Sequence, residues 1–298
     1  MLIEVLGEIY GLISGPPGWR RTVLTELKDL GSKNHPLAPC VVLLYADTTN
    51  RPLVGVIVIE TDDFLMGGLG PKWDGVMDEL KRRFEFGTWT CLRDVAKEYG
   101  GRTLKQLVSF GFHITMTRYL KMKVREIQLA RGRGLKPLDD ATPGEVTGMR
   151  GLVGGMAWSV REGQPWGAGD ASLLAGTLPN PKVKVLQEAN AALRRLIAND
   201  VPIWIKPIPL ERLKLLVFAD SGFGNAGGGA AQLGFMVCVC DQDILSGHEA
   251  DISPLTWKSH KMNRAGANTL FCEWNGLSEG LAHCEWVASW LGLAKSLD

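Results

Sequence analysis

The sequence predicts a mixed fold, with α+β and α/β character, built from three consecutive parts. Strand-like apolar runs gather in two groups, at residues 40–60 and 213–259, and a further strand-like region lies at residues 106–120. A stretch with helical periodicity, residues 143–200, separates the groups, and a second helical pattern follows the last strand. Grouped strands combined with grouped helices are typical of mixed folds. We therefore predict domains at residues 1–137, 138–210 and 211–298, the middle one mostly helical.

Composition limits the classes of function. The chain has 298 residues, 45% of them hydrophobic and 22% charged, with a formal net charge of +1. This is a globular composition without a global basic field, so a nucleic-acid partner would need a local patch. The sequence has no run of about 18 uncharged apolar residues, which argues against a membrane partner. The N-terminal segment lacks the basic residues of a signal peptide. The six cysteines form no CxxC pair, which favours reduced thiols in an intracellular protein, either cytoplasmic or nuclear.

The first part predicts a helix, a hairpin and a second helix. A Gly/Pro turn precedes a helical pattern at residues 19–27. Two apolar runs, residues 40–46 and 53–60, flank a turn-rich hexapeptide and predict a β-hairpin. Neither run alternates between apolar and polar residues, so we expect both faces of these strands to be covered. Residues 72–86 then form an amphipathic helical pattern.

The middle part predicts helices and a linker. Thr142 has the position of an N-cap, with Pro143 at the first helical position and Glu145 three residues after the cap. Residues 183–197 carry an apolar stripe at helical spacing, which we assign to the core. The three prolines of residues 202–211 indicate a linker.

The last part changes to strands. Residues 213–220 predict a strand that ends at Asp220, and residues 222–231 predict a loose glycine-rich turn. Two further strands are expected after this turn, at residues 232–241 and 253–259. A long helix at residues 270–294 follows, with apolar residues along one side: Trp274, Leu277, Leu281, Ala288 and Leu291.

Four acidic residues stand where a metal could be held. Asp62 and Asp63 follow the second apolar run, Asp220 ends a predicted strand, and Glu273 lies early in the last helix. Mg²⁺ takes one or two carboxylates plus substrate phosphates, and two such ions promote phosphodiester cleavage. Each residue alone has a simpler interpretation, because aspartate is common in turns and an acid near a helix N-terminus is stabilised by the helix dipole. Taken singly, the simpler interpretations are favoured.

A basic stretch is hidden in the near-neutral total. It contains the single acid Glu126, and its cations are Arg118, Lys121, Lys123, Arg125, Arg131, Arg133 and Lys136. A solvated surface and a surface that follows nucleic-acid phosphates are equally compatible with this stretch.

Motifs in a fixed order connect these features. EIYGLISGPPGW at residues 8–19 is similar to ALYGLKQAPRAW, and ETDDFLMGG at residues 60–68 is similar to YVDDLLIAG. Residues 142–160 match TPxExxxYRSLVGSLLYLA, FADSGF at residues 218–223 matches YSDADW, and CEWNGLSEG at residues 272–280 matches AEYxALSEA. The segments APC, ELKRRFEFG, GFHITMTRYL and LTWKSHKM fit between them in order. The chain therefore resembles a copia-type LTR-retrotransposon polyprotein, from the middle of the reverse transcriptase into ribonuclease H.

The resemblance implies what each part does. The first part would be a partial reverse-transcriptase palm in which Asp62 and Asp63 hold Mg²⁺. The second would be a thumb-like connection, and the third a partial ribonuclease H domain with Asp220 and Glu273 as Mg²⁺ carboxylates. The intact protein would carry out nucleotidyl transfer and RNA-strand hydrolysis, with an RNA template, a DNA primer or RNA–DNA hybrid, and dNTP as partners. The implied phosphate contacts are Arg118, Lys121, Lys123, Arg125, Arg131, Arg133 and Lys258.

Departures from the family pattern keep alternatives open. Glu60 stands where the family has Tyr, and Gly222 where it has a second acid. The remaining carboxylates of both family sites would lie before and after this chain. An alternative is therefore a catalytically inactive retroelement relic or a nucleic-acid-binding fragment. An unrelated α/β enzyme with Asp220 beside a phosphate-binding loop is disfavoured, because GFGNAGGG lacks the lysine of that motif and leads to a strand.

Overall fold

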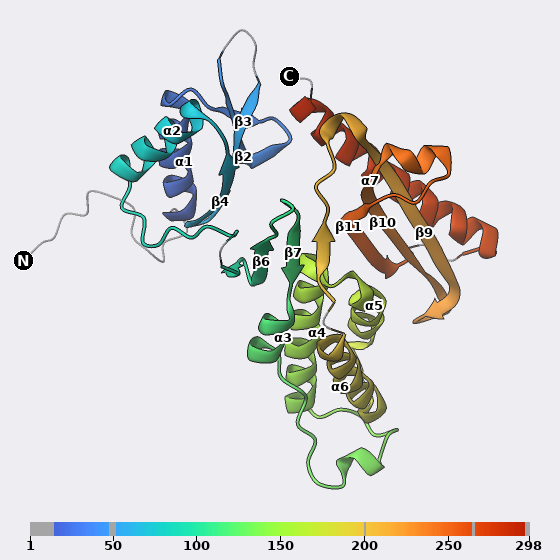
Figure 1. Cartoon of the computed structure of the whole chain (residues 1–298). Coiled ribbons are helices and arrows are strands. Elements are labelled where there is room, and N and C mark those ends of the chain that lie inside the picture. Colours follow the sequence, from blue (N-terminus) through green and yellow to red (C-terminus); the bar gives the residue numbers. More distant parts are fainter. Residues whose placement is uncertain (1–14, 48–51, 94, 200, 264–265, 296–298) are drawn as a thin grey trace, which may run out of the picture. The chain divides into compact units, whose positions relative to one another are not determined.

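The computed structural model describes residues 15–47, 52–93, 95–199, 201–263 and 266–295, so most of the EIYGLISG motif lies outside the described residues. Within them the chain is a mixed α and β protein with three antiparallel sheets (Figure 1). It forms two compact units, Met1–Thr90 with Ser289–Asp298, and Cys91–Ala288. The domain boundaries expected at residues 137 and 210 stay predictions.

The first unit contains a four-stranded sheet in the order β1-β2-β3-β4, and two helices. Its elements are α1 (Gly15–Asp29), β1 (Lys33–His35), β2 (Ala38–Tyr45), β3 (Leu53–Glu60), β4 (Asp63–Gly68) and α2 (Pro71–Arg83). Strands β2 and β3 pair antiparallel, which confirms the predicted hairpin, and both predicted helices are present. The sequence patterns did not predict the short strand β1.

Both helices of the first unit pack on one face of its sheet. Val23 and Leu27 of α1 and Leu80 of α2 share a buried cluster with Ile57 and Ile59 of β3. Along β3 the buried residues alternate with half-buried ones, so the expectation that both faces are covered was wrong for this strand. It is confirmed for the second half of β2, where residues 42–45 are all buried. A sheet with helices on one face leaves the other partly in solvent. The buried face holds β3 and its turn in place.

The second unit begins with a sheet of four short strands and a helical bundle. The sheet has the order β5 (Lys97–Tyr99), β6 (Arg102–Gln106), β7 (Phe112–Thr115) and β8 (Ile203–Ile205). The helices are α3 (Thr117–Lys123), α4 (Pro143–Gly163), α5 (Ala168–Thr177) and α6 (Val183–Ala198), with short 3-10 turns at Arg133–Leu135 and Pro165–Gly167. The predicted linker at residues 202–211 was partly wrong, because β8 lies within it and pairs with β7.

The bundle is held together by an apolar core. Leu120 of α3, Met149 and Met156 of α4, and Leu186 and Leu193 of α6 are fully buried in one cluster. At the start of α4 the predicted capping box is confirmed: the Thr142 hydroxyl accepts from the Glu145 amide, and the Glu145 carboxylate accepts from the Thr142 amide. The predicted core assignment of the α6 stripe is also confirmed.

A three-stranded meander and a long helix complete the second unit. A 3-10 turn at Leu210–Arg212 leads into β9 (Leu213–Ala226), which is followed by β10 (Ala230–Asp241), a 3-10 turn at Gln242–Ser246, β11 (Ile252–Lys261) and α7 (Thr269–Lys295). The strand order is β11-β10-β9. The prediction that the first strand ends at Asp220 was wrong, because β9 continues for six residues into the glycine-rich segment and pairs there with β10.

Two further findings limit the chemistry. In the described part of the chain, no helix is both long and apolar enough to cross a membrane. All six cysteines are free thiols, and burial raises the pKa of Cys238 to about 11. A thiol with such a pKa is protonated at neutral pH and is a poor nucleophile.

Candidate functional site

Asp62 and Asp63 lie at the tip of the hairpin that β3 and β4 form. Glu60 pairs with Asp63 across the two strands, so the turn consists only of Thr61 and Asp62. Thr61 has a φ of 55°, in the left-handed region that two-residue hairpin turns use and that β-branched residues rarely adopt. Both aspartates are exposed, and Ile59, just below them, is buried. The turn is therefore tight, and its carboxylates are presented to solvent on an anchored strand.

Glu60 adds a third carboxylate at this tip. Directly opposed residues of an antiparallel pair have Cβ atoms about 5 Å apart and project from the same face. Glu60 and Asp63 are such a pair, and like charges in this arrangement repel each other. The residue at which the chain departs from the family pattern therefore stands next to a predicted metal ligand.

The tip fits a magnesium ion only in part. The described residues contain no group of three or more His, Cys, Asp or Glu side chains arranged to hold a metal. Mg²⁺, however, is commonly bound by one or two carboxylates, with substrate phosphates and water as its other ligands. Asp62 and Asp63 are exposed and match that partial ligand set. A site formed by protein ligands alone does not match.

Asp220 lies in the middle of β9 and is exposed. Side chains alternate along a strand, so Asp220 shares a face with Phe218, whereas Val217 projects from the other face. Helix α7 packs on the Val217 face, since a Cβ added at Gly280 would lie 2.9 Å from Val217 Cγ1. The Asp220 side chain therefore projects from the face of β9 that α7 does not cover.

The helix that carries Glu273 crosses the same strand. A Cβ added at Gly276 would lie 3.4 Å from the carbonyl oxygen of Asp220, so α7 crosses β9 at this point. Glu273 is half-buried, one helical turn before Gly276. The structure thus brings the two predicted ribonuclease H residues into one neighbourhood but on different faces of the strand. Their joint action on a metal stays a prediction.

An ionic cluster on α7 was not predicted from the sequence. Glu279 Oε1 lies 3.1 Å from His260 Nε2, and Glu279 Oε2 lies 3.7 Å from Lys258 Nζ. Lys258, a predicted nucleic-acid contact, is therefore paired with the helix that covers its strand. Lys258 and His260 are alternate residues of β11 and project from one face. That alternation, with an acid on the sheet side of α7, is the signal that could have predicted the cluster.

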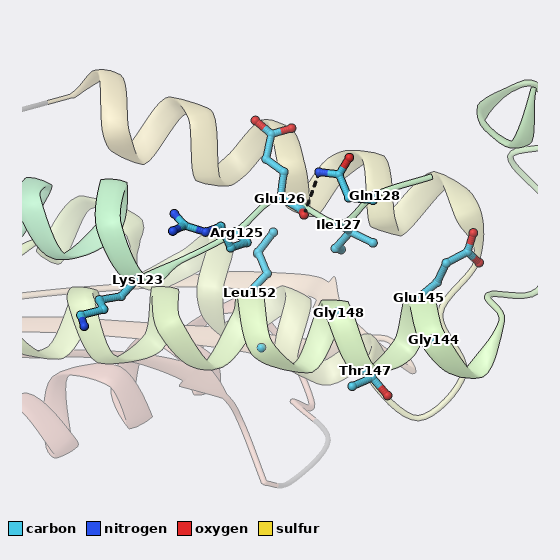
Figure 2. A pocket seen from close by; sticks show the side chains of 11 residues that line it. Lys123, Arg125, Glu126, Ile127, Gln128, Gly144, Glu145, Thr147, Gly148 and Leu152 are labelled. Atoms are coloured by element: carbon cyan, nitrogen blue, oxygen red, sulfur yellow. Dashed lines mark hydrogen bonds between the residues drawn. The ribbon is translucent and has the colours of Figure 1, made fainter. Parts of the chain in front are cut away.

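Two cations of the basic stretch border a groove of about 460 Å³. The groove lies between the first turns of α4 and the segment 124–128, with Lys123 and Arg125 at one end and Glu145 at the other (Figure 2). The segment is fixed at Ile127, whose N–H donates to Asn190 Oδ1 and whose carbonyl accepts from Asn190 Nδ2 at 2.8 and 2.9 Å. The groove therefore has one basic end on an anchored segment.

Arg133 differs from these exposed cations. Its guanidinium lies 3.1 Å from Glu145 Oε1 and 3.0 Å from Asp139 Oδ2, and only 18% of its side chain is exposed. Arg118 makes a looser pair with Glu98, at 3.6 Å. The exposed members of the stretch include Lys121, Lys123, Arg125, Arg131 and Lys136. The stretch thus combines a structural arginine with cations that face solvent.

Replacing Glu145 with Gln is expected to weaken the dependence of stability on acid pH. Hydrogen bonds from Arg133 hold the pKa of this carboxyl below its ordinary value of about 4.5. A carboxyl with a lowered folded-state pKa stabilises the fold above its unfolded pKa, and the contribution is lost as pH falls through the folded value. Urea unfolding midpoints of the full chain, taken between pH 7 and pH 3, measure how stability depends on pH. The control is Glu188→Gln, at an exposed position on α6. If the urea midpoints of both variants fell equally with pH, the prediction would be contradicted.

Comparisons with known proteins identify no family for this chain. No protein-family model, curated protein or solved structure matches this chain. The family resemblance therefore depends on the ordered motifs of the sequence alone.

Proposed function

We propose that the chain is a segment of a retroelement protein that combines an RNA-directed DNA polymerase with ribonuclease H. The observation that carries the proposal is the two-residue turn that presents Asp62 and Asp63 at the tip of a hairpin backed by helices. The antiparallel meander followed by the helix with Glu273 gives further support, because it comes where the motifs expect a ribonuclease H domain.

In this function Asp62 and Asp63 would hold Mg²⁺ together with substrate phosphates. When bound, the metal would align the primer 3′-OH with the incoming dNTP and neutralise charge on the transferred phosphate. The chain's own part is positioning: the tight turn limits the movement of both carboxylates, and the buried face of β3 anchors the turn. In the last part, Asp220 and Glu273 would be contributions to a second Mg²⁺ site.

The basic stretch would hold the nucleic acid. Lys123 and Arg125 stand at one end of the α4 groove, on a segment anchored by Asn190. Cations fixed in this way are suited to contact successive phosphates of a backbone. Arg133, which is paired with Glu145, would support this surface by fixing the chain between α3 and α4.

Removing both cations is expected to weaken binding of a 20-base-pair RNA–DNA hybrid and to reduce its salt dependence. Each lost phosphate contact lowers the slope of log K against log salt by about 1, so Lys123→Ala/Arg125→Ala should lower it by about 2. Fluorescence anisotropy at several KCl concentrations measures both quantities. The control, Lys184→Ala/Arg195→Ala, removes the same charge from exposed positions on α6. An equal loss in the control would contradict a local phosphate site.

The metal assignment is tested by primer extension with the longest protein that contains this chain. We expect Mg²⁺-dependent extension to fall at least about 100-fold in Asp62→Asn and in Asp63→Asn. Each change removes a carboxylate that would hold the metal, and the loss of one group that stabilises transition-state charge typically costs a factor of this size. Asp78→Asn, at an exposed position on α2, should leave extension unchanged. Activity that is unaffected by Asp62→Asn would remove the site assignment.

A second candidate is a nucleic-acid-binding fragment without catalysis. The observation that favours it is the pairing of Glu60 with Asp63, which adds negative charge where the primer phosphates would approach. Hybrid binding that depends on Lys123 and Arg125, together with no primer extension by wild-type protein, would support this candidate. Extension restored by Glu60→Tyr would identify Glu60 as the cause.

A further inference from the structure

The chain between α3 and α4 extends past the end of the helical bundle (Figure 1). Within it, Leu135 and Leu138 have exposed fractions of 87% and 80%, and Pro137 beside them is also exposed. A single exposed leucine is ordinary on a protein surface. Here three apolar residues lie almost side by side in the sequence, so they form an apolar tip on the loop of residues 131–140.

Hydrogen bonds hold loop 131–140 in a fixed shape. The guanidinium of Arg133 bonds to acids of the loop and of α4. From α6, the amide of Lys184 donates to the Pro137 carbonyl at 2.9 Å. Gln187 Nε2 donates to the Gly134 carbonyl at 3.2 Å. The bond to Pro137 lies between the two leucines, so turning the apolar tip toward the core would break it. The loop therefore presents the tip to solvent as part of its own fold.

The charges of the loop leave the apolar tip between two cations. The acids of the loop, Asp139 and Asp140, both form ion pairs with basic side chains of the chain. Arg131 and Lys136 are exposed, and neither has an ion pair within the part of the chain that the structure describes. A partner that complements the tip therefore carries negative charge on both sides of an apolar contact.

The form of the tip favours a nucleic-acid duplex over an acidic protein. A partner helix docks into a groove through several apolar anchors, but neither leucine of the tip lines the groove beside α4. Proteins that deform duplexes insert Leu, Met, Phe or Pro between base steps from the minor groove, with Arg and Lys contacts beside the wedge. The loop also adjoins the surface assigned to phosphates, because Arg133 bonds to Glu145 at the end of that groove.

We propose that the apolar tip is a wedge that enters the minor groove of an RNA–DNA hybrid and separates two stacked base pairs. Leu135 and Leu138 contact the opened step, and Arg131 and Lys136 contact the phosphates on either side of it. The inference rests on the function proposed above for the identity of the duplex. It adds that the chain deforms the duplex as well as holding its phosphates.

Unstacking is measured with 2-aminopurine in the DNA strand of a hybrid of about 12 base pairs, at a central pyrimidine–purine step, where unstacking costs least. We expect the saturating wild-type chain to raise 2-aminopurine fluorescence at least about twofold, because stacked neighbours quench this base and a wedge removes one of them. Fluorescence anisotropy of the same hybrid, labelled with fluorescein, establishes saturation. A fully bound hybrid with unchanged 2-aminopurine fluorescence would overturn the proposal.

Removing the leucines separates the wedge from the phosphate contacts. Leu135→Ala/Leu138→Ala should abolish the fluorescence rise and lower the affinity about fivefold, but should leave the salt dependence unchanged because no phosphate contact is lost. Both leucines are exposed, so the urea midpoint should stay that of the wild type. The control, Leu210→Ala/Leu245→Ala, removes leucines that are 45% and 74% exposed elsewhere in the second unit and should change neither quantity. A fluorescence rise that persists without the tip leucines would contradict the wedge.

Removing the cations gives the reciprocal result. Arg131→Ala/Lys136→Ala should lower the slope of log K against log salt by about 2. At saturation the fluorescence rise should persist, because the leucines are still present. An unchanged salt slope would show that these cations do not contact phosphates and would overturn their part in the proposal.

An acidic peptide tests the competing occupant. The probe is a labelled helix of about 21 residues with Leu at the a and d positions of each heptad and Glu at e and g. We expect no binding of this peptide that depends on the tip leucines. Peptide binding that Leu135→Ala/Leu138→Ala abolishes, with hybrid affinity equal to that of the wild type, would assign the tip to a protein partner and overturn the proposal.

The outcomes separate this inference from the proposed function. If the wild-type chain does not bind the hybrid at all, both fail. If binding occurs and is weakened in Lys123→Ala/Arg125→Ala, but 2-aminopurine fluorescence does not respond, the phosphate surface stands and the wedge is overturned.

Discussion

Replacing Gly68 with alanine is expected to destabilise the first compact unit by about 3 kcal/mol, since overpacking a closed site typically costs this much. An ideal Cβ at Gly68 would lie 2.2 Å from Trp73 Cδ2 and 2.7 Å from the Val54 carbonyl oxygen. The second neighbour is backbone, which cannot move aside as a side chain can. Gly55 pairs with Gly68 across β3 and β4, and a Cβ at Gly55 would lie 2.1 Å from Cε3 of the same indole. Trp73 thus packs on a pair of glycines.

The neighbouring glycine provides a matched control for this prediction. A Cβ at Gly67 would meet nothing within 4 Å, so Gly67→Ala should change stability by no more than about 0.5 kcal/mol. Urea unfolding of the full chain, with hydrogen exchange of the β3 amides to isolate the first unit, measures the difference. In the Gly68→Ala background, Trp73→Leu should recover part of the loss. If Gly67→Ala and Gly68→Ala were equivalent, Trp73 would not be seated as described.

This glycine pair shows why the first unit could be predicted only in outline. The β2–β3 hairpin and helix α2 follow from apolar runs, turn residues and helical spacing, which are local signals. The adjacent aspartates likewise predicted a turn, which is found at Thr61 and Asp62. The need for Gly68 arises from Trp73, which approaches from a helix. No local sequence pattern indicates that contact between Trp73 and Gly68.

The last part of the chain shows a second limit. Glycine and proline were interpreted as breaks, so β9 was expected to end at Asp220 and residues 202–211 to form a linker. Pairing overrides this preference: Gly222 lies opposite Gln232 within the β9–β10 ladder, and Trp204 lies opposite His113. A partner strand satisfies backbone groups whatever the local propensity. This is why Asp220 lies within a strand and not at the end of one.

Helix α7 shows a related limit. Its apolar side was correctly grouped from the sequence, but apolar residues commonly face a core, and here they face outward. The orientation is decided by the small residues Gly276 and Gly280, which contact the sheet. The candidate pair Asp220 and Glu273 depends on that orientation, so its geometry could not follow from the position of two acids in the sequence.

Two adjacent glycines of α4 are expected to respond to alanine with opposite signs. Gly154 is exposed, and a Cβ there would meet nothing within 4 Å, so Gly154→Ala should stabilise the second unit by about 1 kcal/mol through helix propensity. A Cβ at Gly155 would lie 2.5 Å from Cγ2 of Val124. Val124 is buried and has a stiff β-branched side chain. Gly155→Ala should therefore destabilise the unit by about 2 kcal/mol despite the better propensity.

The same contact links the stability of α4 to the groove. Val124 lies between Lys123 and Arg125, so a methyl group at Gly155 that displaces it also displaces both cations from the end of the groove. Urea midpoints measure the stability of each variant, and anisotropy with the RNA–DNA hybrid measures binding under folding conditions. We expect Gly155→Ala to weaken binding and Val124→Ala in that background to restore the urea midpoint in part. If Gly155→Ala loses stability but binds the hybrid as the wild type does, the segment 124–128 anchors the fold, and the phosphates are held elsewhere on the basic stretch.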